Sequence, residues 1–86
     1  MPELCRFYGI IIRMFWADHP PAHFHATYGE HEALFEIQSS EVIEGWLPAR
    51  ACKLVEEWIE LHREELTEVW GLATDSQPLR KIDPLP

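Results

Sequence analysis

A single long amphipathic segment, from Pro48 to Trp70, is the feature that most constrains the fold of this chain. When its residues are placed at about 100° per step, apolar side chains gather on one arc and charged side chains on the opposite arc. The apolar arc consists of Ala51, Leu54, Val55, Trp58, Leu61, Leu66 and Val69. Pro48 suits the first turn of a helix, and Gly71 is a stop signal. We therefore expect one helix over about residues 48–70, with Trp58 buried near the centre of its packed face.

The residues before this segment alternate between apolar and polar side chains, as strands with one buried face do. The pattern predicts strands over residues 7–16, 22–28 and 32–38, and a short edge or bulged strand over 42–47. In the first strand the apolar face consists of Tyr8, Ile10, Ile12, Met14 and Trp16. Because the strands follow one another closely, we expect a meander.

The chain is therefore expected to form a single α+β domain over residues 1–86. An antiparallel three- to four-stranded meander sheet, over about residues 5–47, is covered on one face by a single long C-terminal helix. Residues 74–86 are polar and rich in proline, so they are expected to form an irregular tail that rests on the domain.

The composition argues against several classes of function. Fifteen acidic residues against seven basic ones give a net charge of -8, so direct contact with nucleic acid is not expected. Cys5 and Cys52 have the spacing of neither a disulfide framework nor a zinc site, which fits a reducing compartment. The most apolar stretch, residues 7–16, is too short to span a membrane and carries no cleavage signal. We therefore expect a cytoplasmic protein with no membrane contact.

Three histidines, His19, His23 and His25, lie close together in the sequence. His23 and His25 are two apart on a predicted strand and point the same way, and a proline-stiffened loop holds His19 beside them. Imidazoles arranged in this way can bind a divalent transition metal such as zinc, nickel, copper or iron. The alternative is a structural, hydrogen-bonding role. We assign no carboxylate to this candidate site.

A second candidate pair, His62 and Glu65, interrupts the apolar arc of the helix. Residues three apart on a helix are neighbours, so the two side chains can touch. A carboxylate on a core-facing position must be paired, neutralised or functional, which makes the pair a candidate for catalysis. In the alternative, Glu65 reaches solvent at the edge of the helix and His62 bonds to a backbone carbonyl. Strand alternation directs His23 and His25 away from the helix, so the two clusters are expected to be separate.

The charged arc of the helix carries glutamates at four-residue spacing. They are Glu56, Glu60, Glu64 and Glu68. Like charges at this spacing cost a few tenths of a kcal/mol per step, so the strip does not favour the helix itself. It is either a solvated face or a surface that meets a basic partner, which would neutralise it and speed association.

Two blocks of the sequence are distinctive. One is Asp18-His19-Pro20-Pro21-Ala22-His23-Phe24-His25-Ala26, and the other is Leu61-His62-Arg63-Glu64-Glu65-Leu66. Together with Arg6-Phe7-Tyr8-Gly9-Ile10 and Glu44-Gly45-Trp46-Leu47-Pro48, they resemble the bacterial domain of unknown function 4160 family over nearly the whole chain. The resemblance implies a small stand-alone protein, often encoded beside another small protein in toxin-antitoxin-like arrangements, with no established activity. It also implies that His19, His23, His25, His62 and Glu65 belong to the shared pattern.

The leading functional hypothesis is a non-enzymatic protein-interaction module, and the resemblance implies that it is one member of a toxin-antitoxin-like pair. Its partner would be a protein encoded nearby or a second copy of the chain. The alternative is a metal-dependent hydrolase or nuclease-like enzyme, in which His19, His23 and His25 hold the metal and Glu65 or Glu36 is the base. No cofactor is implied beyond that divalent metal.

Overall fold

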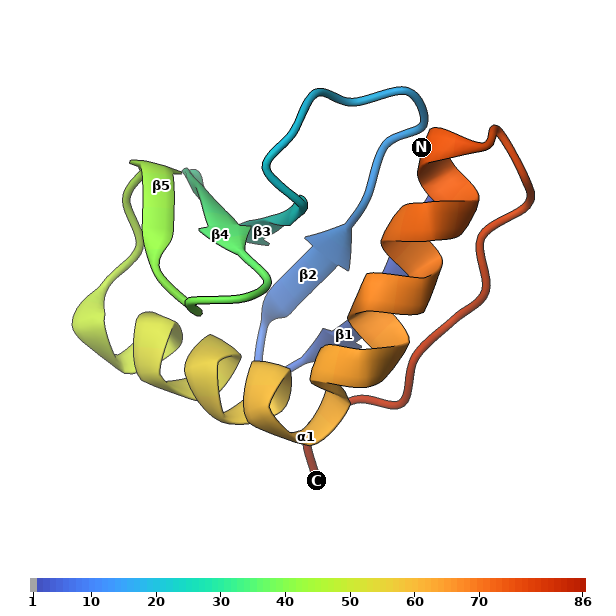
Figure 1. Ribbon diagram of the computed structural model, residues 1–86. Helices are drawn as coiled ribbons and strands as arrows, with labels where there is room; N and C mark the ends of the chain where they lie inside the picture. Colours follow the sequence, from blue (N-terminus) through green and yellow to red (C-terminus); the bar gives the residue numbers. More distant parts are fainter. Residues whose placement is uncertain (1) are drawn as a thin grey trace.

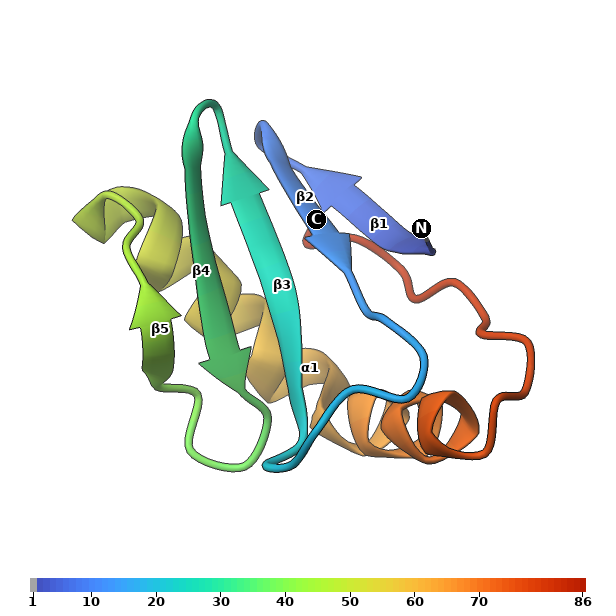
Figure 2. The same cartoon turned by 90° about the horizontal axis from the view of Figure 1, so that it is seen from above.

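The computed structural model describes residues 2–86. Its elements are β1 (Glu3–Phe7), β2 (Ile10–Arg13), β3 (His23–Tyr28), β4 (His31–Glu36), β5 (Val42–Gly45) and α1 (Ala49–Thr74). The strands form one antiparallel sheet in the order β1-β2-β3-β4-β5, so each strand pairs with the next. Helix α1 lies across one face of this sheet (Figures 1 and 2). The predicted α+β meander with one long C-terminal helix is confirmed.

The segment expected as a single strand over residues 7–16 instead contains the end of β1, a turn and the whole of β2, so the chain reverses here in a hairpin. Tyr8 and Gly9 form its two-residue turn with φ values of 50° and 82°, and Phe7 pairs with Ile10 across it. A two-residue turn with positive φ at both positions matches the right-handed twist of the flanking strands. The reversal restarts the alternation, so Phe7 is buried while Tyr8 is exposed. Trp16, predicted on the apolar face, also lies outside the core.

The core lies between the sheet and α1, and Trp58 is at its centre. Its indole ring is fully buried and packs against Phe7 and Phe24 at ring-centroid distances of 5.5 and 5.6 Å. The buried apolar residues of β2, β3 and β4 alternate as predicted, and are Ile10, Ile12, Phe24, Ala26, Ala33 and Phe35. The prediction that Trp58 packs against the sheet is therefore confirmed.

Helix α1 is bent, as its two arms in Figure 1 show. The bend lies at His62, whose φ of −128° and ψ of 20° are not helical. Ile59 is buried before the bend, whereas Leu61, predicted on the packed arc, is 60% exposed. The helix also continues through Gly71 to Thr74, past its expected end. A glycine within a helix costs only about 1 kcal/mol, and the burial of Ala73 in the last turn opposes that cost.

The C-terminal tail packs along the helix and sheet. Ile82 is buried, and its backbone N–H donates to the carbonyl of Leu4 at 3.2 Å. The indole Nε1 of Trp58 donates to the carbonyl of Asp83 at 2.8 Å. The tail thus closes one side of the core. Within residues 2–86, no helix has the length and apolar character needed to cross a membrane.

Candidate metal centre

The loop between β2 and β3 carries Asp18 to the end of the sheet where β3 begins. The backbone N–H of His19 donates to Asp18 Oδ1 at 2.9 Å and fixes the carboxylate. The loop then passes through a cis bond between Pro20 and Pro21. At its end, the carbonyl of Ala22 accepts a hydrogen bond from the N–H of Ile37 at 3.0 Å. Hydrogen bonds therefore hold the loop at Asp18 and at Ala22, and the Asp18 carboxylate has a defined position.

His23, the first residue of β3, is held on both sides of its ring. Its Nδ1 lies 2.7 Å from the carbonyl oxygen of Pro21, and its Nε2 lies 3.0 Å from Asp18 Oδ2. The side chain is only 1% exposed. Its ring packs on that of Trp70 in α1, with centroids 5.3 Å apart. The expectation that His23 points away from the helix was therefore wrong, because the second arm of α1 reaches the start of β3.

His25 is held in the same way. Its Nδ1 lies 3.0 Å from Glu32 Oε2 on β4, and its Nε2 lies 3.5 Å from Asp18 Oδ2. The ring of Phe15 meets the imidazole edge-on at a centroid distance of 4.4 Å. The Nε2 atoms of His23 and His25 therefore converge on one carboxylate oxygen. One ligand atom from each of Asp18, His23 and His25 lies within 4.8 Å of the others.

The hydrogen-bond geometry of this cluster favours a cation beside the Asp18 carboxylate. The carbonyl of Pro21 can only accept, so Nδ1 of His23 carries a proton, whereas both ring nitrogens of His25 face carboxylate oxygens and either can be the donor. If the His23 ring is neutral, its Nε2 then presents a lone pair to the Asp18 carboxylate, which is repulsive. Either a second proton on the ring or a bound metal ion relieves this repulsion. Imidazoles oriented through Nδ1–H by an oxygen acceptor are also the usual arrangement around protein metals.

The electrostatics of Asp18 suit the binding of a cation. Burial alone would raise the pKa of this carboxyl, because the charged form loses contact with water. The bond from the His19 backbone, the bond from His25 and the nearby charges of the histidine side chains outweigh burial and lower the pKa. The carboxylate is therefore ionised at neutral pH, as a metal ligand must be.

The structure places the three predicted histidines together but gives them unequal positions. His19 is 82% exposed, and its Nδ1 lies 3.1 Å from Asp18 Oδ1, whereas His23 and His25 contact Oδ2. The buried triad instead takes Asp18 as its third member. Asp18 was not among the predicted site residues, although it directly precedes His19 in the distinctive block. Its position next to three histidines was the available signal.

The predicted pair on α1 is formed. His62 Nδ1 lies 2.6 Å from Glu65 Oε1, and the His62 ring packs near Trp58 with centroids 5.6 Å apart. Glu36, the other predicted base, accepts a hydrogen bond from Ser39 Oγ. The polar contacts of both carboxylates thus go to neighbours other than the triad.

The acidic strip on α1 is exposed but is not continuous, because the bend at His62 separates its two halves. Glu56 and Glu60 lie on the first arm, and Glu64 and Glu68 lie on the second. Glu60 pairs with Arg63 at 3.3 Å, and Glu68 pairs with Arg80.

One protein-family model matches most of the chain. The model of the family described as Domain of unknown function (DUF4160) matches residues 9–71. The chain belongs to the DUF4160 family. The matched region of this DUF4160 protein contains both the triad and the His62/Glu65 pair. No curated protein and no solved structure matches the chain.

Proposed function

We propose that this DUF4160 protein binds one divalent transition-metal ion through Asp18, His23 and His25. One observation carries the proposal. Both imidazoles have Nδ1 against an oxygen acceptor and direct Nε2 to the same Asp18 oxygen, at 3.0 and 3.5 Å. Donors that share an ion at about 2.1 Å each lie about 3.0 to 3.4 Å apart, so the 3.0 Å spacing fits a common metal and the 3.5 Å spacing is slightly longer than this range.

The donor set indicates the class of metal. Two imidazoles and one carboxylate suit zinc or iron(II), and such sets leave coordination positions open for water. A metal in this site would supply Lewis-acid activation of bound water, the chemistry of the hydrolase alternative. Glu65 bonds to His62 and Glu36 bonds to Ser39, so neither carboxylate forms a hydrogen bond with the triad, although Glu36 lies opposite His23 in the β3–β4 pairing. The proposal is therefore for metal binding.

Metal analysis of protein purified without an affinity tag tests this function. We expect about one equivalent of zinc or iron per chain after dialysis, and loss of that stoichiometry in Asp18→Asn and His23→Gln. His31→Gln is the matched control, because His31 is exposed on β4 and packs beside Trp46. His19→Gln should keep the stoichiometry. If wild type retains no more metal than His23→Gln, the cluster is only an imidazolium–carboxylate network and the proposal fails.

A second candidate function is the protein-interaction module. The exposed Leu61 supports it, because this side chain lines a hollow of about 470 Å³. The other lining residues are Arg63 and three carboxylates, Glu60, Glu64 and Glu65. An exposed apolar side chain beside several carboxylates suits a basic partner that packs one of its own apolar side chains against Leu61. The family resemblance suggests a neighbouring gene as its source, in a toxin-antitoxin-like pair.

Co-purification tests the interaction module. We expect Glu60→Gln/Glu64→Gln to reduce recovery of the neighbouring gene product from a co-expressing strain. Glu30→Gln/Glu44→Gln removes the same charge away from α1 and should leave recovery unchanged. Equal recovery with both double variants across a range of salt concentrations would exclude the acidic strip as the contact surface.

A further inference from the structure

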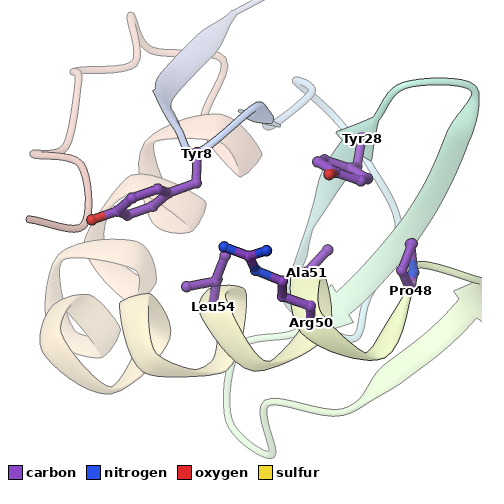
Figure 3. Close-up of a pocket in the computed structure, with 6 residues that line it drawn as sticks. All are labelled: Tyr8, Tyr28, Pro48, Arg50, Ala51 and Leu54. Atoms are coloured by element: carbon purple, nitrogen blue, oxygen red, sulfur yellow. The ribbon is translucent and has the colours of Figure 1, made fainter.

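A hollow of about 380 Å³ lies between the tips of two hairpins and the first turns of α1. Its lining residues are Tyr8, Tyr28, Pro48, Arg50, Ala51 and Leu54 (Figure 3). Tyr28 ends β3, and His23 of the candidate metal centre begins the same strand. The hollow therefore lies at the opposite end of β3 and is a separate feature of the surface.

Two exposed tyrosines form walls of this hollow, and each is held by backbone. The hydroxyl of Tyr8 donates to the carbonyl of Pro86 at 2.7 Å, so the tail holds the far end of its ring. The ring of Tyr28 lies over Gly9, where an added Cβ would be 3.2 Å from Tyr28 Cε1. Tyr8 is 58% exposed and Tyr28 is 38% exposed, and their rings lie on either side of the hollow in Figure 3. Aromatic surface is thus kept open to solvent.

The hollow also contains a positive charge in a strongly acidic protein. Within residues 2–86, the arginines in ion pairs are Arg6, Arg63 and Arg80, so Arg50 has no carboxylate partner there. Figure 3 shows its guanidinium group extending from α1 toward the space between the two tyrosines. The first turn of α1 contains no acidic residue and no side-chain cap, so the positive end of the helix adds to this charge. The local field therefore favours an anion.

We propose that this hollow binds a small planar aromatic molecule that carries one anionic group, either a carboxylate or a phosphate. The aromatic ring of the ligand packs against Tyr8 and Tyr28, and its anionic group accepts hydrogen bonds from Arg50. The planar guanidinium fork matches both anions in bidentate geometry, and offset aromatic packing supplies the apolar contact. The volume lies within the range of small-molecule sites.

Chemical-shift titration of the ¹⁵N-labelled protein tests the proposal and identifies the anion. The probes are adenosine monophosphate and benzoate, with adenosine and inorganic phosphate as the ring-only and anion-only controls. We expect saturable shifts at the amides of Gly9, Tyr28 and Ala51 with at least one of the two anionic aromatic probes. Each control should bind at least about tenfold more weakly than the probe that shares its group. Which probe binds tighter distinguishes phosphate from carboxylate.

Matched variants connect the binding to this hollow. Arg50→Gln should weaken the preferred probe about tenfold, and Tyr28→Leu should weaken it while preserving the native spectrum. Lys53→Gln removes the same charge from a residue that lines a different hollow, and should have no effect. Equal weakening by Lys53→Gln and Arg50→Gln would show general charge attraction and overturn the proposal. Shifts that do not saturate with either aromatic anion, or that map elsewhere, would overturn it as well.

Discussion

The imidazole of His23 and the indole of Trp70 pack with their ring centroids 5.3 Å apart. This contact joins the start of β3 to the second arm of α1, on the far side of the bend at His62. The candidate metal centre is thus supported by the helix on one side and by the Asp18 loop on the other. Metal binding at the centre should therefore change the environment of the Trp70 indole.

Trp70 provides a readout of metal binding. A paramagnetic ion such as Co²⁺ quenches nearby indoles, so binding to the triad should quench the fluorescence of Trp70 more than that of the other tryptophans. We expect Trp70→Phe to lose most of the Co²⁺-dependent quench while it retains the metal stoichiometry. Trp46→Phe, at an exposed position beside His31, should keep the quench. An undiminished quench in Trp70→Phe would place the ion away from His23.

The core should depend strongly on Trp58. Its ring is fully buried between Phe7 and Phe24, and its Nε1 also holds the tail through Asp83. Trp58→Ala should lower the free energy of unfolding by about 3 to 5 kcal/mol, measured by urea denaturation. Trp46→Ala, at an exposed position, should cost less than about 1 kcal/mol. A loss below about 1 kcal/mol for Trp58→Ala would contradict the packing described here.

Gly45 should tolerate no side chain. Its φ is +83°, and an added Cβ would lie 2.2 Å from the carbonyl oxygen of Glu32 and 3.0 Å from the Cα of Ala33. Because both neighbours are backbone atoms of β4, Gly45→Ala must separate β5 from the sheet or distort it. We expect a loss of more than about 2 kcal/mol in the free energy of unfolding.

Gly29→Ala is the control, since Gly29 has a φ of +60° but no atom within 4 Å of its added Cβ. It should lose only the cost of the backbone conformation, about 1 to 2 kcal/mol. Equal losses for the two variants would show that the close approach of Gly45 to β4 has no energetic consequence.

Alternation located the core because one face of the sheet is buried. Ile10, Ile12, Phe24 and Ala26 are all buried at the expected period. The β1–β2 turn was missed because Tyr8 continues the apolar alternation, so that only Gly9 marked the reversal.

The bend of α1 was missed for a different reason. An arc drawn at constant steps assumes a straight helix, and neither proline nor glycine stands at His62 to signal a kink. The histidines of the candidate site were recognised by residue type and spacing. Asp18 was not, because its role depends on the path of a loop that returns it to the start of β3. Local patterns predict which side chains share a face, whereas contacts made by a loop depend on the folded chain.

The last prediction concerns Cys5, whose reactivity should report on the closure of the sheet edge. Burial, helped by the charge of Glu3, raises the pKa of this thiol from 9.0 to about 12. Only the thiolate is nucleophilic, so native Cys5 should react with a disulfide reagent at pH 8 far more slowly than in the urea-unfolded chain. Cys52→Ala isolates this thiol for the measurement, and Cys5→Ala isolates the less buried Cys52 for comparison.

The raised pKa of Cys5 also determines how the free energy of unfolding changes with pH in alkaline solution. Between about pH 9 and 12 the unfolded chain loses the Cys5 proton and the folded chain keeps it, so the free energy of unfolding should fall as the pH rises through this range. Cys5→Ala should reduce that slope, measured by urea denaturation at a series of pH values. Rapid labelling of Cys5 in the folded Cys52→Ala variant would show instead that β1 and the tail residue Ile82, which donates to Leu4, separate readily from the sheet.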